Sequence, residues 1–514
     1  MGRRVLSLKS LSFLTLIFFL SASFTHAATK TFVYHLNGEP DFLDPIKSTT
    51  VRSDHVYWFI LEALVVLSKD GKGVEPGLAE RWDVGADRLT YTFHLRKGVQ
   101  FHDGTPFNAE SVKISIERIF NSSSPYYTTE PKNSFERFYA ELIHGVKVVD
   151  DFTVEVKLRN PDFLRFASLY IVSPSALKKM GKDFVKHPIG TGPFTFETWS
   201  KGEIVLSANP HYWRGRPGVE KVIYRIIPNA SDAVEGLLKG EIDYNWNIEP
   251  QYYERISESP HLRLFPVSAL NTYYLGFYTH KGFSRVAAAR RAMAHAINVP
   301  RMVLFLGRGG ALPAHGLIPP SAAGYRSDIR QPEYDIARAR EILRRGGLEK
   351  GGPLTLLYTD SVTFVSEVAH AIQSDLRKVG IEVTLKGYPE WRDVVESVRR
   401  QEGDMFIYNW SVAAPDPGRF LYPLFHSEAI GRTNFFSYAN PEVDRLLSEA
   451  RKPMEESKRL RLLQEAERII VRDVPAVFLF HQVRMAAANK RVKNLEINIY
   501  SRPQDKFLTV DLEP

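Results

Sequence analysis

The chain contains no cysteine among its 514 residues, and this absence restricts how it can fold. Disulfide bridges, thiolate metal sites and thiol catalysis are all excluded. The fold must therefore be stabilised by buried apolar side chains. A chain several times longer than one ordinary domain can supply them over more than one lobe.

The first 27 residues differ in character from the rest of the chain. Basic residues within the first nine positions precede an apolar run from Leu11 to Leu20, and small residues then lead to Ala27. This order predicts a secretory signal peptide over residues 1–27, cleaved near Ala27. A membrane anchor is the weaker interpretation, because the apolar run is shorter than the ~20 residues that span a bilayer. Without a cysteine, the exported product is expected to carry no lipid.

The formal net charge of +8 does not indicate nucleic-acid binding, which requires clustered basic residues. The densest basic stretch lies within residues 338–345 and contains Arg338, Arg340, Arg344 and Arg345. Their spacing is typical of the solvent-exposed face of a helix. We therefore expect no nucleic-acid partner.

Strand and helix patterns recur along the mature chain and predict a mixed α/β fold. In the first half, strand patterns occupy 31–36, 89–95, 152–158 and 221–227, apolar helical spacing covers 55–67, and a helix follows Pro106 with Asn108 as its N-cap. From about residue 271, helical patterns at 284–298, 335–345, 364–379 and 455–472 accompany strand patterns at 354–358, 381–386 and 404–409. That alternation predicts βα units and a partly parallel sheet.

Several motifs, in order along the chain, carry a family resemblance. They are Glu39-Pro40, Leu43-Asp44-Pro45, Gly77–Trp82, Tyr91–Val99, Phe101–Glu110, Gly190–Phe194, Asn209-Pro210 with Tyr212-Trp213, Gly240–Asp243, Asp416-Pro417 with Phe420, and Tyr438 with Asn440–Asp444. Together they closely resemble the extracellular solute-binding proteins of family 5, the class of dipeptide-, oligopeptide- and nickel-binding proteins of ABC transporters.

The resemblance implies a periplasmic-binding-protein-like fold of type II, with two main lobes, a hinge and an inserted third domain. Lobe I would combine residues 28–55, 188–270 and 485–514, lobe II would be an insertion over 56–187, and lobe III would cover 271–484. The lobes would close on a ligand by hinge motion. The expected product is a periplasmic monomer without cofactor or metal, which delivers its ligand to an inner-membrane permease driven by a cytoplasmic ATPase.

The chain departs from the peptide-binding members at one informative position. In those members, an Asp three positions after a Trp holds the ammonium group of the peptide, whereas here Trp410 is followed by Ala413. An ammonium buried without a counter-charge costs several kcal/mol. We therefore expect a ligand without a free amine, unless Asp416 substitutes through a rearranged loop.

Further candidate ligand-binding residues follow from the same resemblance. Glu39 occupies a position where some members contact the peptide amine, and Tyr273 and Tyr274 begin the third lobe at the cleft. Trp410 would form an aromatic wall and Ala413 would leave space. Arg419 and Arg432 are cations that suit a ligand carboxylate, although an ordinary surface role is the alternative for both.

Other functions are less well supported by the sequence. The chain has no His-Glu-x-x-His pair, Gly-x-Ser-x-Gly elbow or Walker loop, so an enzyme, such as a secreted hydrolase, is not expected. A sugar derivative or a nickel chelate as ligand stays open, with His315 and His426 as weak metal candidates. The same fold could also serve a chaperone or chemosensory role.

Overall fold

A computed structural model of the chain describes Gly2 and residues 30–513, apart from 128–138, 307–308, 350, 413 and 504. With the exception of Gly2, the predicted signal peptide lies outside the described residues, as does Ala413. The mixed α/β content predicted from the sequence is confirmed.

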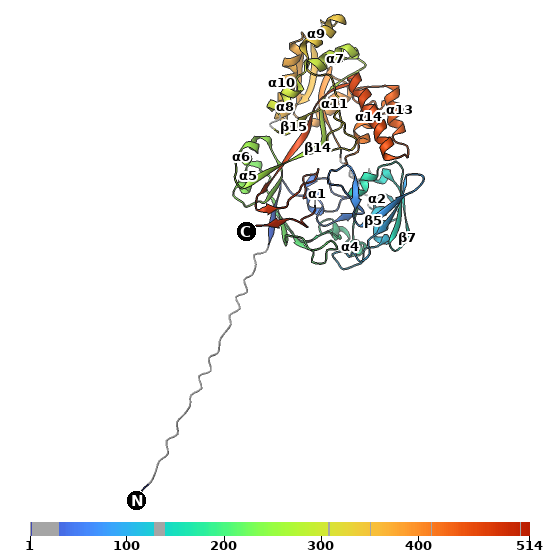
Figure 1. Ribbon diagram of the computed structural model, residues 1–514, viewed down its shortest axis with the longest axis vertical. Helices are drawn as coiled ribbons and strands as arrows, with labels where there is room; N and C mark the ends of the chain where they lie inside the picture. The colour runs from blue at the N-terminus through green and yellow to red at the C-terminus, as the bar shows by residue number, and fades with distance from the viewer. Residues whose placement is uncertain are drawn as a thin grey trace.

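One large sheet runs through most of the molecule (Figure 1). Its strands, in spatial order, are β10 (Phe194–Ser200), β11 (Glu203–Ala208), β12 (Lys221–Ile226), β1 (Thr31–Leu36), β13 (Tyr244–Ile248), β19 (Ala476–Asn489), β14 (Leu262–Phe277), β18 (Met405–Ser411), β16 (Leu354–Thr359) and β17 (Val383–Tyr388), and β15 (Ala311–Pro313) pairs with β19. The pairs of β1 with β12 and of β16 with β17 are parallel. The second pair lies in the region where the alternating pattern predicts a partly parallel sheet.

Two long antiparallel strands, β14 and β19, join the lower and upper parts of the molecule in Figure 1. Their register shifts between Ser268 and Thr272, where the extra residues of β14 form a bulge. A bulge bends its strand and increases the local twist. The crossing therefore has the geometry expected of a hinge between the two parts.

The lower part contains a second sheet, in the order β5 (Ala79–Val84), β6 (Thr90–Leu95), β8 (Thr153–Leu158) and β7 (Ile143–Asp150). Helix α2 (Ala109–Phe120) contributes to the same apolar core. Asn108 caps this helix as predicted, with its side chain accepting from the backbone of Ser111. The smaller elements of the lower part are α1 (Val51–Tyr57), α4 (Pro174–Met180), α5 (Ala230–Leu238), α6 (Tyr253–Ser257), β2 (Glu62–Ala63), β3 (Val65–Leu67), β4 (Val74–Pro76), β9 (Tyr170–Ile171), β20 (Val492–Lys493), β21 (Asp511–Leu512) and the 3-10 turns Phe163–Ser168, Gly181–Val185 and Pro250–Tyr252.

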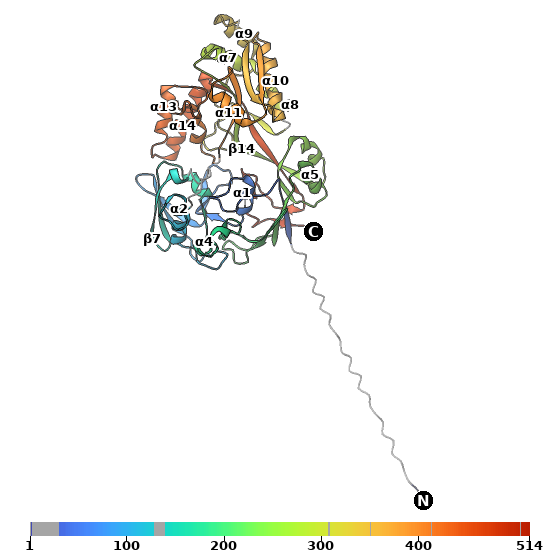
Figure 2. The same ribbon diagram turned by 180° about the vertical axis from the view of Figure 1, so that it is seen from behind.

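The upper part is formed by helices around β16, β17 and β18 (Figure 2). The helices are α7 (Ala287–Ala296), α8 (Val299–Leu306), α9 (Ile336–Arg345), α10 (Thr363–Arg377), α11 (Trp391–Arg399), α12 (Gly418–Phe425), α13 (Pro441–Glu449) and α14 (Glu456–Asp473), with 3-10 turns at Phe283–Arg285 and Ser427–Ala429. The basic face of α9 is exposed, which confirms its predicted contact with solvent.

The helix predicted over residues 55–67 is wrong in most of its length. Helix α1 ends at Tyr57, and β2 and β3 follow. Residues 59–65 are buried without interruption, so their apolar pattern reflects complete burial and not one helical face. This segment forms backbone hydrogen bonds to a segment remote in sequence. For example, Ile60 O accepts from the backbone N–H of Gly192 at 3.0 Å. A side chain at Gly192 would collide with this backbone, since a Cβ there would lie 2.4 Å from Phe59 O.

Candidate functional site

A cavity of about 980 Å³ lies where the three regions predicted as lobes meet, beside the crossing of β14 and β19. Segments 45–75, 139–170 and 484–506 supply most of its wall, and Leu270, Ser411 and Val412 complete it from the hinge side. Pockets for small ligands commonly measure about 300–1,000 Å³. The cavity is therefore large enough for a peptide-sized molecule.

Aromatic side chains form much of the wall. Tyr57 and Tyr170 pack edge to face with their ring centroids 5.3 Å apart. Trp58 and Tyr500 line the cavity as well, and the guanidinium of Arg502 lies over both rings, 5.3 and 5.1 Å from their centroids. Such rings present a broad rigid surface to a ligand and position the cation between them.

Two cations at the cavity come from the C-terminal segment. Arg502 is buried and lies 3.5 Å from the carboxylate of Asp54, which also accepts from the hydroxyl of Tyr57. The buried ammonium of Lys506 donates to Leu61 O at 2.8 Å. Burial lowers the pKa of Lys506 to about 8 because the charged form is poorly solvated there.

Arg165 and Arg484 approach the cavity from other elements. Arg165 belongs to the 3-10 turn Phe163–Ser168 and lies 4.0 Å from Asp162. Arg484 lies on β19 opposite Val267, directly before the bulge. Burial and the neighbouring charge of Arg502 both lower the pKa of Arg484. The cavity is thus lined by cations from the hinge strand β19, from the C-terminal segment and from residues 56–187, which were predicted as the inserted lobe and are called the inserted region below.

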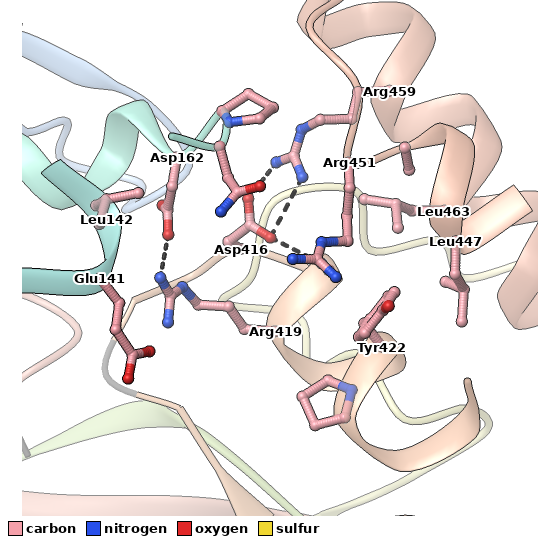
Figure 3. A pocket seen from close by; sticks show the side chains of 15 residues that line it. Glu141, Leu142, Asp162, Asp416, Arg419, Tyr422, Leu447, Arg451, Arg459 and Leu463 are labelled. Carbon is pink, nitrogen blue, oxygen red and sulfur yellow. Dashed lines mark hydrogen bonds and ion pairs between the residues drawn. The ribbon is translucent and has the colours of Figure 1, made fainter. Parts of the chain in front are cut away.

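The inserted region and the helical upper part touch around Asp162 and Arg419 (Figure 3). Asp162 and Arg419 point towards each other and form an ion pair, and both are largely buried. Arg88 and Glu455 form a second, more exposed pair between the same two regions. Both pairs join the two regions, and Asp162 and Arg419 also line a smaller cavity of about 280 Å³.

Asp416 and Arg419 lie beside this contact, whereas the large cavity is lined by other residues. The carboxylate of Asp416 is buried and bound by Arg459, and it accepts from the backbone N–H of Gly418 at 2.8 Å. Its charge is thus neutralised within the protein. Arg419 directs its guanidinium to Asp162.

The predicted aromatic residues at the start of the upper part also lie outside the wall of the large cavity. Tyr274 is fully buried in the apolar core. The ring of Tyr273 stacks on Phe480 with centroids 4.6 Å apart. The indole N–H of Trp410 donates to Arg419 O at 2.9 Å. In this conformation, these side chains support the scaffold beside the hinge.

Glu39 and Arg432 are exposed and do not reach the cavity wall. The carboxylate of Glu39 accepts from the indole of Trp199 at 3.1 Å and from the backbone of Gly202 at 3.0 Å. Arg432 donates to Glu428 O at 3.0 Å. Neither residue is brought together with the other candidates.

Sequence reasoning missed the cavity cations Arg165, Arg484, Arg502 and Lys506. One signal for Arg484 was present, because it is a charged residue within the otherwise mostly apolar run 476–488. Charged residues are rarely buried in a strand without a partner or a function. Arg165 lies in a short 3-10 turn and Arg502 and Lys506 in an irregular segment, and none of these is long enough or regular enough for a periodic pattern to indicate which side chains face inward.

Within the described ranges, no group of three or more His, Asp or Glu side chains could hold a metal ion. His315 contacts Arg330, and His426 contacts Ser448. Among the described helices, none is both long and apolar enough to cross a bilayer.

Comparison with known proteins gives consistent results over nearly the whole chain. The family model described as bacterial extracellular solute-binding proteins, family 5 middle, matches residues 73–432. Heme-binding protein A of Haemophilus influenzae is 30% identical, over 91% of this chain and 90% of its own length.

Two solved structures are similar in fold. HbpA2 from Haemophilus parasuis has a TM-score of 0.88 at 28% identity, covering 94% of this chain and 100% of that one. The ABC transporter-associated periplasmic binding protein DppA from Helicobacter pylori, in complex with the peptide STSA, has a TM-score of 0.71 at 28% identity, with coverages of 94% and 98%. The predicted periplasmic-binding-protein-like fold is thereby confirmed.

Proposed function

Because this chain belongs to the bacterial extracellular solute-binding proteins of family 5, we propose that it captures a peptide-sized ligand for an ABC importer. The observation that carries this proposal is the cavity of about 980 Å³ enclosed by three regions of the chain beside a two-stranded hinge. The protein acts by binding and release and performs no chemical step on its ligand.

The working cycle follows from the hinge and from the contact between the inserted region and the upper part. Bending at the bulge between Ser268 and Thr272 would separate Asp162 from Arg419 and open the cavity. A ligand that touches the walls of all three regions stabilises the closed form more than the open one. It therefore shifts the population towards closure. The closed form would then dock on an inner-membrane permease driven by a cytoplasmic ATPase.

We further propose that the ligand lacks a free ammonium group. Ala413 stands where peptide-binding members carry an Asp, and the carboxylate of the nearby Asp416 is already neutralised by Arg459. An ammonium placed there would lose its hydration without gaining a counter-charge. Blocked or cyclic peptides, or non-peptide ligands such as sugar derivatives or chelates, meet this condition. The relative named for heme and the solved structure with the peptide STSA illustrate how widely ligands vary among similar proteins.

The chain would reach its site of action by export. The basic and apolar segments before Ala27 support a cleaved signal peptide, and the lack of cysteine supports a product without lipid. We propose that the mature protein works as a monomer in the periplasm. N-terminal sequencing of the protein recovered from a bacterial periplasm would test this, with Ala28 as the expected first residue.

Thermal melting of the mature protein against a ligand panel tests the proposed function. The panel contains free dipeptides, their N-acetylated and cyclic counterparts, sugars, and nickel with a chelator. A ligand at a hundred times its dissociation constant stabilises the folded form by about 2.7 kcal/mol. We expect a shift with blocked or non-peptide ligands. Micromolar binding of an unblocked dipeptide would overturn the proposed lack of an ammonium group.

A further inference from the structure

The charged side chains that line the large cavity do not balance. Among the described residues, the lining contains six cations and four acids. The cations are Lys69, Arg165, Arg214, Arg484, Arg502 and Lys506, and the acids are Asp54, Glu62, Glu75 and Asp505. The empty cavity therefore carries an excess of positive charge.

Two of the four acids already accept several hydrogen bonds from other groups of the protein. The buried carboxylate of Glu62 accepts from Thr191, Tyr212 and Trp213 at 2.7–2.9 Å. The carboxylate of Asp505 accepts from the backbone N–H groups of Phe507 and Thr509.

Neither of the other two acids forms an ion pair with Arg484 among the described residues. Asp54 is shared between the hydroxyl of Tyr57 and the guanidinium of Arg502. Glu75 is exposed on β4. The acids thus leave the cation on the hinge strand without a counter-charge.

Arg484 is a cavity cation that the described part of the protein leaves without a counter-charge. Its side chain is partly buried at the cavity, and within the described ranges its guanidinium has no ion pair or hydrogen bond to another side chain or carbonyl. The charge that most affects it is the like charge of Arg502, which lowers its pKa further. Taking a cation out of water without compensation costs several kcal/mol.

We propose that Arg484 binds an acidic group of the ligand, a carboxylate or a phosphate, and that the ligand is negatively charged overall at neutral pH. This deepens the proposed function, on which it rests, because it gives the ligand class for the same cavity. A guanidinium offers two parallel N–H donors to such a group, which makes the bond short and directional. An acidic group at Arg484 also compensates Arg502.

The position of Arg484 links this recognition to closure. It pairs with Val267 on β14, next to the bulge at which the two long strands cross. An acidic group bound there would lie at the base of the cavity beside the hinge. The aromatic rings of Trp58 and Tyr500 would then hold the rest of the ligand. Neutral ligands of equal size would fill the same space and leave Arg484 uncompensated.

Paired peptide libraries test this inference. The mature protein is dialysed against N-acetylated tripeptides with a free C-terminal carboxylate and, separately, against the same tripeptides as C-terminal amides. Bound members are identified by mass spectrometry and measured by calorimetry. We expect the acids to bind, most tightly when they also contain Glu or Asp, and the amides to bind at least ~30-fold more weakly.

Substitutions assign the effect to Arg484. We expect Arg484→Gln to weaken binding of the best acidic peptide about 30-fold or more, and Arg484→Lys to weaken it less, since the charge remains. Arg344→Gln, which removes an exposed arginine of α9, is the matched control and should bind normally. Urea unfolding of each variant confirms that it is folded.

The outcomes separate the two proposals. Equal affinity for acids and amides, or unchanged affinity of a folded Arg484→Gln variant, would overturn the acidic-ligand inference and leave the binding function intact. Failure of both libraries to bind would count against the proposed peptide-like ligand itself, and the inference would fall with it.

Discussion

Two groups of arginines, each with one buried and one half-buried member, differ in how their charge is compensated. Arg459 and Arg419, at the contact between the inserted region and the upper part, bind the carboxylates of Asp416 and Asp162 (Figure 3). Of Arg484 and Arg502, at the large cavity, Arg502 pairs with the carboxylate of Asp54, and Arg484 has no carboxylate partner among the described residues. We refer to the first group as the contact arginines and to the second as the cavity arginines.

The difference separates a structural role from a binding role. Where the protein supplies the carboxylate, the arginine fixes two segments to each other, and its removal leaves a buried charge unpaired. Where the protein leaves the carboxylate out, the cation destabilises the empty protein and is available to a ligand. Residue type and degree of burial are matched between the two groups, so the counter-charge, which Arg484 lacks, is the difference that matters.

The largest effect is expected from breaking the pair of Arg459 and Asp416. Arg459→Met leaves the carboxylate of Asp416 buried without its partner and should lower the free energy of unfolding by about 3–5 kcal/mol. This loss in the free energy of unfolding is measured by urea titration, with circular dichroism as the signal. Arg461→Met, on the exposed face of the same helix, is the control and should change stability by less than about 0.5 kcal/mol. If both variants lost the same free energy of unfolding, the ion pair of Arg459 and Asp416 would contribute nothing beyond an exposed arginine.

A smaller effect is expected from the pH dependence of Lys506. The folded protein holds the pKa of this ammonium at about 8, below its unfolded value of about 10.4. Between these values the unfolded chain binds more protons, so stability rises with pH in this window. Relative to Lys506→Met, the wild type should gain roughly 2–3 kcal/mol between pH 7 and pH 10.5. A constant difference over this range would show that the cavity does not disfavour the charge.

The two ion pairs that close the contact offer a matched comparison. Arg419→Gln removes the partner of the buried Asp162 and should cost about 2 kcal/mol, with a larger radius of gyration in X-ray scattering as the regions separate. Arg88→Gln removes the exposed partner of Glu455 and should cost less than about 1 kcal/mol. If both variants scatter like the wild type, neither pair contributes to closure.

Much of the fold could be predicted because its local signals act over short distances. The strand at 90–95 alternates buried and partly exposed side chains, and the helix after Asn108 begins with a capping side chain. Both are specified by residues adjacent in sequence. Residues 59–65 were misassigned because they are buried on all sides by segments remote in sequence, and complete burial removes the periodicity that distinguishes helix from strand.

The candidate site was harder to predict for a related reason. Asp416 could be singled out from its motif, but its pairing with Arg459, 43 positions further along, depends on how α12 packs against α14. Arg484 and Arg502 reach one cavity from a strand and an irregular segment. Compensation of charge is a property of the folded arrangement, and no local pattern encodes it.

The most direct test of the difference between the two groups is the stability of Arg484→Met without ligand, measured beside Arg459→Met. Each protein is unfolded in urea, dialysed to remove any bound molecule, refolded and then titrated with urea. We predict that Arg484→Met is at least as stable as the wild type, with a gain of up to about 1 kcal/mol, because it removes an uncompensated, partly buried cation. A loss as large as that of Arg459→Met would contradict the account, because it would show that the protein already compensates Arg484 and leaves no charge for a ligand.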